Sequence, residues 1–373
     1  MQTNIQKSNF SKEKSFALKG IAIILMMLHH TFRSDTLYSD FHISFFPLGQ
    51  QWVTRFASVA KICVPIFAFI SGYGLYLSYK NSTDKGIKWT IIRYIKTFSG
   101  YWFIWIASSI ITQIASGRFE KVFGQENIWK QMLNIVIDFL GLANLYRTPT
   151  LNGTWWYMGA AFVFIVLTPF LLANEKNLCG CLLVEVIFLR VLCGKNSALA
   201  FPGGNTAFVY LFVFTLGMVF AKYKLVDRII NSGMKPLRFF VELLLLVLCF
   251  NLYINIETRL FWELKWGIIP VLLILFCVEF IIQIKFIGNI LCFLGKHSMN
   301  IYMIHTFIRG VYFHSITYSM RHFGLVILFL LVSSLLCSII VETIKKIIKY
   351  DVFISKLSDK LVGQLSSVAD VGK

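Results

Sequence analysis

Long apolar segments recur along almost the whole chain, separated by short polar stretches. They cover 16–33, 59–79, 97–115, 128–145, 154–173, 178–193, 206–221, 238–255, 266–284, 290–313 and 323–343. Most of them approach the roughly 20 residues that an α-helix needs to cross the hydrocarbon core of a bilayer. The pattern therefore predicts an all-α polytopic membrane protein.

The segment 128–145 differs from the others because it carries Lys130, Asn134 and Asp138. An aspartate at the bilayer centre costs on the order of 3 kcal/mol on insertion scales. We therefore expect about ten transmembrane helices. The segment 128–145 is expected to be a re-entrant or interfacial amphipathic helix within an outer loop, 116–153.

Lysine and arginine are distributed unevenly between the loops. With ten spans, 21 of them lie on the side of the N-terminus and 9 on the opposite side, whereas an eleventh span at 128–145 removes this bias. Cytoplasmic loops are rich in Lys and Arg, so both termini are expected on the cytoplasmic side of the cell membrane. Residues 1–346 are expected to form a single membrane domain and 347–373 a polar, partly disordered cytoplasmic tail.

Composition supports this class, since 57% of the residues are hydrophobic and only 14% are charged, against about a quarter charged in soluble domains. The net charge of +18 follows from the basic loops, and no basic and aromatic motif indicates a nucleic-acid partner. The eight cysteines lie mostly in or beside apolar segments and include no C-x-x-C pair. They favour buried apolar residues over a disulfide framework or a zinc site.

Two histidines, His29 and His30, close the first apolar segment. Ionisable side chains are costly at membrane depth, and histidine is the commonest general base near neutral pH. The pair is therefore a candidate catalytic group. The structural alternative is that both histidines cap the helix at the membrane interface.

Two further groups of polar residues have helical spacing. Arg93 and Lys96 are three residues apart, so they share a helix face and present two cations, either as a positive-inside anchor or as a phosphate contact. Ser298, Tyr302 and His305 follow at i, i+4 and i+7, along one face of one helix. Interhelical hydrogen bonding is the structural alternative for that stripe.

Together these segments resemble acyltransferase family 3, the integral membrane acyltransferases that O-acylate sugars, lipids and cell-envelope polymers. The resemblance rests on Lys19 to His30, on 67–74 around Ser71, on 93–102, on Trp155-Trp156 and, most specifically, on 294–305, which reads Leu-Gly-x-x-Ser-x-x-Ile-Tyr-x-x-His. Lysine replaces the family's usual arginine at positions 19 and 96, and lysine lacks the bidentate fork of arginine.

The resemblance implies an acyl-CoA-dependent O-acetyltransferase. Such an enzyme transfers an acyl group, expected to be acetyl, from cytoplasmic acyl-CoA to a hydroxyl of an extracytoplasmic or lipid-linked cell-surface polysaccharide or other glycan. It has acetyl-CoA as its donor substrate and no permanently bound cofactor or metal. A transporter or flippase of lipid-linked glycan precursors is the alternative, although no internal repeat supports it.

The resemblance also implies roles for individual residues. His30 is expected to be the general base on the acceptor hydroxyl, and His305 to orient it or to serve the leaving thiolate. Arg93 and Lys96 are expected to hold the CoA phosphates. The other expected substrate contacts are Lys19, Ser71, Ser298 and Tyr302, with Trp155 and Trp156 stacking on a sugar and with Asp138 and the loop 116–153 shaping the acceptor pocket.

Ser298 is not expected to carry the acyl group. It lies two helical turns, roughly 10 Å, from His305, whereas a seryl nucleophile needs a base within hydrogen-bond reach. We therefore expect direct transfer in a ternary complex.

The topology is testable by labelling single cysteines. Lys224→Cys and Gln125→Cys are expected to react with a membrane-impermeant maleimide from opposite sides, because the charge bias puts 222–238 inside and 116–153 outside. Labelling of Lys224→Cys from outside in intact cells would contradict the ten-span arrangement.

Overall fold

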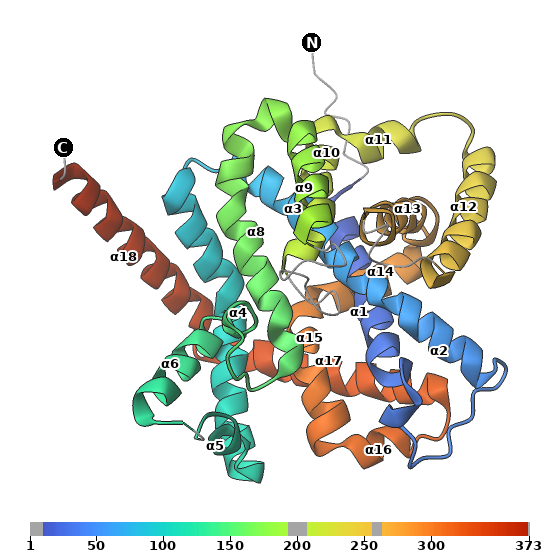
Figure 1. The fold of residues 1–373 in the computed structure, drawn as a ribbon, viewed down its shortest axis with the longest axis horizontal. Helices are drawn as coiled ribbons and strands as arrows, with labels where there is room; N and C mark the ends of the chain where they lie inside the picture. The colour runs from blue at the N-terminus through green and yellow to red at the C-terminus, as the bar shows by residue number, and fades with distance from the viewer. Residues whose placement is uncertain (1–9, 125, 193–206, 256–262, 372–373) are drawn as a thin grey trace.

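The protein is described here by a computed structural model covering residues 10–124, 126–192, 207–255 and 263–371. Every regular element in these ranges is a helix, and the helices gather into one bundle (Figure 1). The all-α fold is therefore confirmed. Gln125, chosen above for labelling, lies outside the described residues.

Within the described ranges, seven helical stretches are long and apolar enough to cross a membrane. They are α1 (Lys12–Phe32), α2 (Gln50–Val59) continuing through a 3₁₀ turn into α3 (Cys63–Lys80), α4 (Gly86–Ser116), η3 (Gly153–Trp155) with α8 (Trp156–Ala173), α12 (Lys235–Asn255), α13 (Ile269–Phe276) with its flanking π-helical turns, and α17 (Phe323–Ile347).

The other three predicted spans also fall on helices, but on shorter or interrupted ones. They correspond to α9 (Leu178–Leu192), to α10 (Leu211–Tyr223) with the turn before it, and to α14 (Lys285–Lys296) followed by α15 (Ser298–Thr306). The shorter helices outside these spans are α5 (Arg118–Phe123), α6 (Ile128–Phe139), α7 (Ala143–Tyr146), α11 (Leu225–Ile230) and α16 (His314–Tyr318). The polytopic membrane class is therefore confirmed.

Helices α1 and α14 touch backbone to backbone. A Cβ atom added to Gly20 would lie 2.1 Å from the carbonyl oxygen of Leu291, and one added to Gly295 would lie 1.7 Å from that of Phe16. Both distances are far below van der Waals contact, so only glycine fits at either position. Small residues are the usual means of close helix approach in membranes.

Helices α3 and α10 meet in the same way. A Cβ on Gly72 would lie 1.9 Å from the carbonyl oxygen of Phe214, and one on Gly217 would lie 2.3 Å from that of Phe69. The Ser71-Gly72 pair therefore serves two purposes. Its glycine packs two helices together, and its serine remains available to the neighbouring cavity.

The predicted continuous helix 290–313 is wrong, because the chain breaks at His297. This residue has φ −92° and ψ 0°, between α14 and α15, and residues Phe307–Tyr312 continue α15 as a π-helix. The His297 ring is hydrogen-bonded to the Ser338 hydroxyl of α17 over 2.8 Å. The break gives α15 a direction of its own while this bond holds its start against α17.

Helix α6 occupies the first part of the predicted amphipathic segment. Its apolar side chains, including Trp129 and Leu133, are exposed, whereas Asn134 and Asp138 are only 3% and 1% exposed. The helix ends before Gly141, which has a φ of +74°. At 12 residues, or about 18 Å, it is too short to span a bilayer, and its outward apolar face is typical of an interfacial helix.

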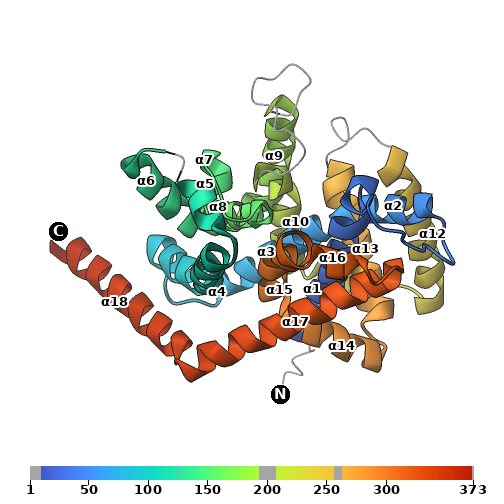
Figure 2. The ribbon, with the colours of Figure 1, turned by 90° about the horizontal axis from the view of Figure 1, so that it is seen from below.

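The two sides of the bundle carry different connections. In Figure 2, α5, α6, α7 and α2 lie at the upper side, and α14 and the junction of α17 and α18 (Tyr350–Val371) lie at the lower side. The predicted outer loops 34–58 and 116–153 contain α2 and α5 to α7. Their shared side agrees with the charge-based threading, and the orientation of the termini stays a prediction.

The end of the chain differs from the partly disordered tail that its polar composition predicted. Residues Tyr350–Val371 form a helix that bends away from the direction of α17, and its far end projects from the bundle (Figure 2). The Tyr350 hydroxyl donates a hydrogen bond of 2.9 Å to the Ser99 carbonyl of α4, and its ring contacts Phe103 at 5.2 Å. Ile354 is also buried, so this segment packs on the membrane domain.

The glycine contacts make a test of packing. Gly20→Ala and Gly295→Ala are expected to prevent stable folding, because each added methyl group would meet a backbone carbonyl that has no room to move. Gly310→Ala is the matched control, since its methyl group would meet nothing within 4 Å. Thermal unfolding in detergent, followed by size-exclusion fluorescence, is the measurement, and wild-type melting of Gly20→Ala would contradict the packing.

Candidate active site

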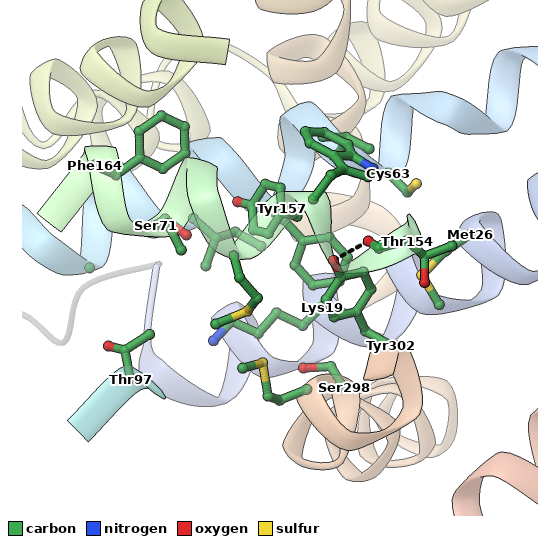
Figure 3. Close-up of a pocket in the computed structure, with 18 of the residues that line it drawn as sticks. Lys19, Met26, Cys63, Ser71, Thr97, Thr154, Tyr157, Phe164, Ser298 and Tyr302 are labelled. Atoms are coloured by element: carbon green, nitrogen blue, oxygen red, sulfur yellow. Dashed lines mark hydrogen bonds between the residues drawn. The ribbon is translucent and has the colours of Figure 1, made fainter. Parts of the chain in front are cut away.

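A cavity of about 330 Å³ lies between α1, α3, α4, α8 and α15, and we call it the central cavity. Its lining follows α1 from Ser15 to Arg33, a length of about 27 Å. Figure 3 shows Thr97 and Cys63 at its opposite ends, with Ser71, Tyr157 and Tyr302 between them. The cavity therefore extends along nearly the full length of the first helix.

Most of the predicted site residues line the central cavity. They are Lys19, His30, Ser71, Arg93, Trp156, Ser298 and Tyr302. His305, Trp155 and Lys96 do not line it. Residues from α1, α3, α4, α8 and α15 thus meet around one space.

Lys96 is the candidate that the structure leaves out. The cavity is lined by Arg93 and Thr97, which are four residues apart on α4, whereas Lys96 is exposed on the neighbouring flank of the helix. A helix at the edge of a cavity presents only one narrow stripe to it. Of the two cations expected to act together, only Arg93 therefore lines the central cavity.

The rings of His30 and His305 meet, with centroids 5.0 Å apart and planes inclined at 45°. The Nδ1 atom of His305 lies 2.8 Å from the Tyr302 carbonyl oxygen, which can only accept a hydrogen bond. The proton of the neutral ring is therefore on Nδ1, and Nε2 is an acceptor. This Nε2 atom is buried and has no hydrogen-bond partner in the described part of the chain.

His29 has a different environment. Its Nδ1 atom donates a hydrogen bond of 2.8 Å to the Ala57 carbonyl of α2, because the carbonyl can only accept. Its ring lies 5.2 Å from that of His30. His29 also lines the central cavity, but its bond to α2 gives it a structural role that His30 lacks.

The central cavity is positively charged. Its lining includes Lys19, Arg33, Lys61 and Arg93, and no Asp or Glu is among the lining residues. The Nε atom of Arg93 is buried and has no hydrogen-bond partner in the described ranges. Cations that line a cavity without acidic lining residues favour an anionic ligand. Among the described residues, no group of three or more His, Cys, Asp or Glu side chains gathers for a metal ion.

The turn before α8 is fastened to α15. Asn152 donates from Nδ2 to the Thr306 hydroxyl over 2.8 Å, and Trp155 donates from Nε1 to the Met303 carbonyl over 3.1 Å. Tyr302 donates from its hydroxyl to a backbone carbonyl of the same turn. Trp155 is consequently buried as a packing residue and does not form the sugar-facing wall of the central cavity.

Three residues at this site were not selected from the sequence. Arg33 follows His30 by three residues and lines the same cavity, and Tyr157 directly follows the tryptophan pair. Arg309 follows His305 by four residues, and its Nε atom is buried with no hydrogen-bond partner in the described ranges. Arg33 and Arg309 have helical spacing from residues already chosen, which predicts a shared face, whereas Tyr157 is the sequence neighbour of Trp156.

The fold and this site define a class of protein. It is an integral membrane protein with a cationic cavity and a histidine pair inside its helical bundle. Residues 17–343 match the family model of acyltransferase family 3, described as an acyltransferase domain. The match covers most of the chain, which therefore belongs to this family and is a membrane acyltransferase. No curated protein and no solved structure matches it.

The histidines predict different effects of substitution. His30→Ala is expected to lower acyl transfer by about 10²- to 10⁴-fold, which is the usual contribution of a general base, with little change in membrane level. His29→Ala is expected to act mainly on stability, since it removes the bond to Ala57. Turnover and thermal unfolding of both purified variants separate the two effects, and a larger turnover loss in His29→Ala would reverse the assignment.

Proposed function

We propose that this acyltransferase is an O-acetyltransferase that moves an acetyl group from cytoplasmic acetyl-CoA to a hydroxyl of an extracytoplasmic or lipid-linked glycan. One observation carries the proposal. A single cavity connects the cations Lys19 and Arg93 with His30 farther along α1, whose ring meets that of His305. This arrangement suits a donor that has anionic phosphates at one end and a reactive thioester at the other.

The donor would enter at the end lined by Lys19 and Arg93. Lys19 and His30 are eleven residues apart on α1, or about 16 Å along the helix axis, a length that suits the extended pantetheine arm of CoA. The phosphates would contact Lys19 and the Arg93 guanidinium, which can form paired hydrogen bonds to an oxyanion. Ser71 and Tyr302 line the path between the two ends.

The chemical step follows from the histidine pair. His30 takes the proton from the acceptor hydroxyl as the oxygen attacks the thioester carbonyl carbon. The tetrahedral intermediate then collapses, the carbon–sulfur bond breaks, and the thiolate recovers that proton from His30. His305 is a positioning residue, because its bare Nε2 offers a lone pair that stabilises the protonated His30 ring.

Direct transfer fits the placement of the serine. Ser298 lines the central cavity at the start of α15, seven residues before His305. A covalent acyl-serine would need a base beside that hydroxyl, and the histidine pair lies about two turns farther along. Ser298 is therefore proposed as a substrate contact.

The sides of the membrane complete the proposal. The predicted cytoplasmic termini would put the Lys19 end of the cavity inside the cell and the Arg33 end outside, in the cytoplasmic membrane. Family membership favours acyl transfer over the transporter or flippase alternative. Consumption of acetyl-CoA thioester by purified protein, dependent on His30, tests this choice, and its absence would return the transporter to consideration.

The donor site predicts a contrast between two neighbouring cations. Arg93→Ala is expected to raise KM for acetyl-CoA by about tenfold with a smaller change in kcat, because phosphates remote from the thioester contribute mostly uniform binding. Lys96→Ala is the matched control and is expected to leave both constants within about twofold of wild type, because its side chain is outside the cavity. Equal KM values in Arg93→Ala and wild type would contradict phosphate binding there.

A further inference from the structure

A second cavity, which we call the outer pocket, lies beside the central one. Its volume is about 360 Å³, and it is bounded by α4, by α6 and α7, and by the η3 turn. Its polar lining includes Asp138, Asn144, Arg147 and Thr148, and two of its aromatic lining residues are Trp155 and Trp156. No family motif marks α6 or α7, and the reaction proposed above does not use this pocket.

The outer pocket combines two kinds of group that suit a sugar ring. Indole rings offer flat apolar surfaces for the C–H faces of a pyranose. Carboxylate, amide and guanidinium groups supply acceptors and donors for its hydroxyls. The Thr148 hydroxyl oxygen is buried and has no hydrogen-bond partner in the described ranges, so one polar group here still lacks a bond that a ligand would provide.

The pocket has a rigid wall built around Asp138. Its carboxylate accepts hydrogen bonds from Trp105 Nε1 over 2.9 Å and from the Leu151 backbone N–H over 3.1 Å. The Tyr101 hydroxyl donates a hydrogen bond of 2.5 Å to the backbone carbonyl of Asp138. Burial raises the pKa of this carboxyl, and the hydrogen bonds to it oppose that shift. Asp138 therefore holds α6 against α4 and fixes the shape of the pocket.

Two exposed residues at the mouth complete the lining. Asn144 lies within α7, and Arg147 follows this helix with a φ of +55°, a left-handed conformation that is uncommon outside glycine. Both side chains line the pocket. Glycine would adopt the backbone conformation of Arg147 at a lower energy than arginine does. The guanidinium is therefore kept at a strained position, which is typical of functional sites.

The two cavities share one wall. Trp156 lines both of them, Thr154 lines the central cavity, and Gly153 lines the outer pocket. This turn is also the one that is hydrogen-bonded to α15 through Trp155 and Met303. A ring in the outer pocket would thus lie against the segment that separates it from the histidine pair.

We propose that the outer pocket is the acceptor subsite, which binds one pyranose ring of the glycan next to the ring that is acylated. Arg147 and Asn144 bind its polar substituents, and Trp156 stacks against it. The adjoining ring then passes Trp156 and brings its hydroxyl to His30. This inference rests on the proposed function, since it assigns the acceptor of that reaction to a second cavity.

The test uses Arg147→Gly and Asn144→Ala in cells that carry the gene. Glycine is favoured at the backbone conformation of Arg147, so Arg147→Gly removes the guanidinium without straining the fold. Lys130→Ala is the control, because it removes an exposed cation of the same loop that does not line the pocket. The readouts are base-labile acetate on purified surface glycan and the affinity of the purified variants for radiolabelled acetyl-CoA.

Both pocket variants are expected to lower the surface ester by about tenfold, the effect of losing one hydrogen bond to a charged or polar group. Acetyl-CoA affinity is expected to stay within about twofold of wild type, and Lys130→Ala to match wild type in both readouts. Unchanged ester in Arg147→Gly and Asn144→Ala, or a parallel loss of acetyl-CoA affinity, would overturn the acceptor subsite. Failure of the proposed function gives a different result, because the ester would then persist in His30→Ala cells or wild-type protein would not bind acetyl-CoA.

Discussion

The contact between the backbones of α1 and α14 is the constraint on which the site depends. Gly20 and Gly295 allow the two helices to meet at atomic contact, and each lies ten residues before a histidine of the pair. His30 is therefore reached from this crossing along about 15 Å of α1, and His305 is reached through the break at His297 and along α15. A side chain at either glycine would separate the helices and, with them, the two imidazole rings.

Helix α15 forms hydrogen bonds to neighbouring elements on both of its sides. These bonds fix the position of His305, whereas His30 lies on α1. On one side, Asn300 donates to the Ser338 hydroxyl and to the Glu342 carboxylate of α17. On the other side, the turn before α8 bonds to its last residues. Polar groups at membrane depth need partners inside the protein, and here those partners also fix His305. His30 lines the cavity and forms no hydrogen bond of this kind within the described ranges, so its ring is available to a substrate.

Hydropathy predicted the helices because it depends on local periodicity, and seven of the ten site residues that the family resemblance implied line the central cavity. The break at His297 was missed, since it depends on a bond to Ser338 some forty residues away. The position of Lys96 outside the cavity lining could not be predicted, because spacing gives a shared face but not the width of the stripe that faces a cavity. The α18 helix packs through Tyr350, and the outer pocket is assembled from separate segments. Neither the packing of α18 nor the outer pocket can be predicted from the sequence pattern of a single segment.

The length of the central cavity explains how the proposed reaction can join substrates on opposite sides of a membrane. Neither a phosphorylated donor nor a glycan is easily moved through hydrocarbon, because each polar group would lose its bonds to water. A cavity lined by Lys19 at one end and Arg33 at the other lets each substrate stay on its own side. The neutral acetyl group alone then needs to travel, carried on the flexible arm of its donor. The histidine pair would accordingly belong near the acceptor end, and His30 is three residues from Arg33 but eleven from Lys19.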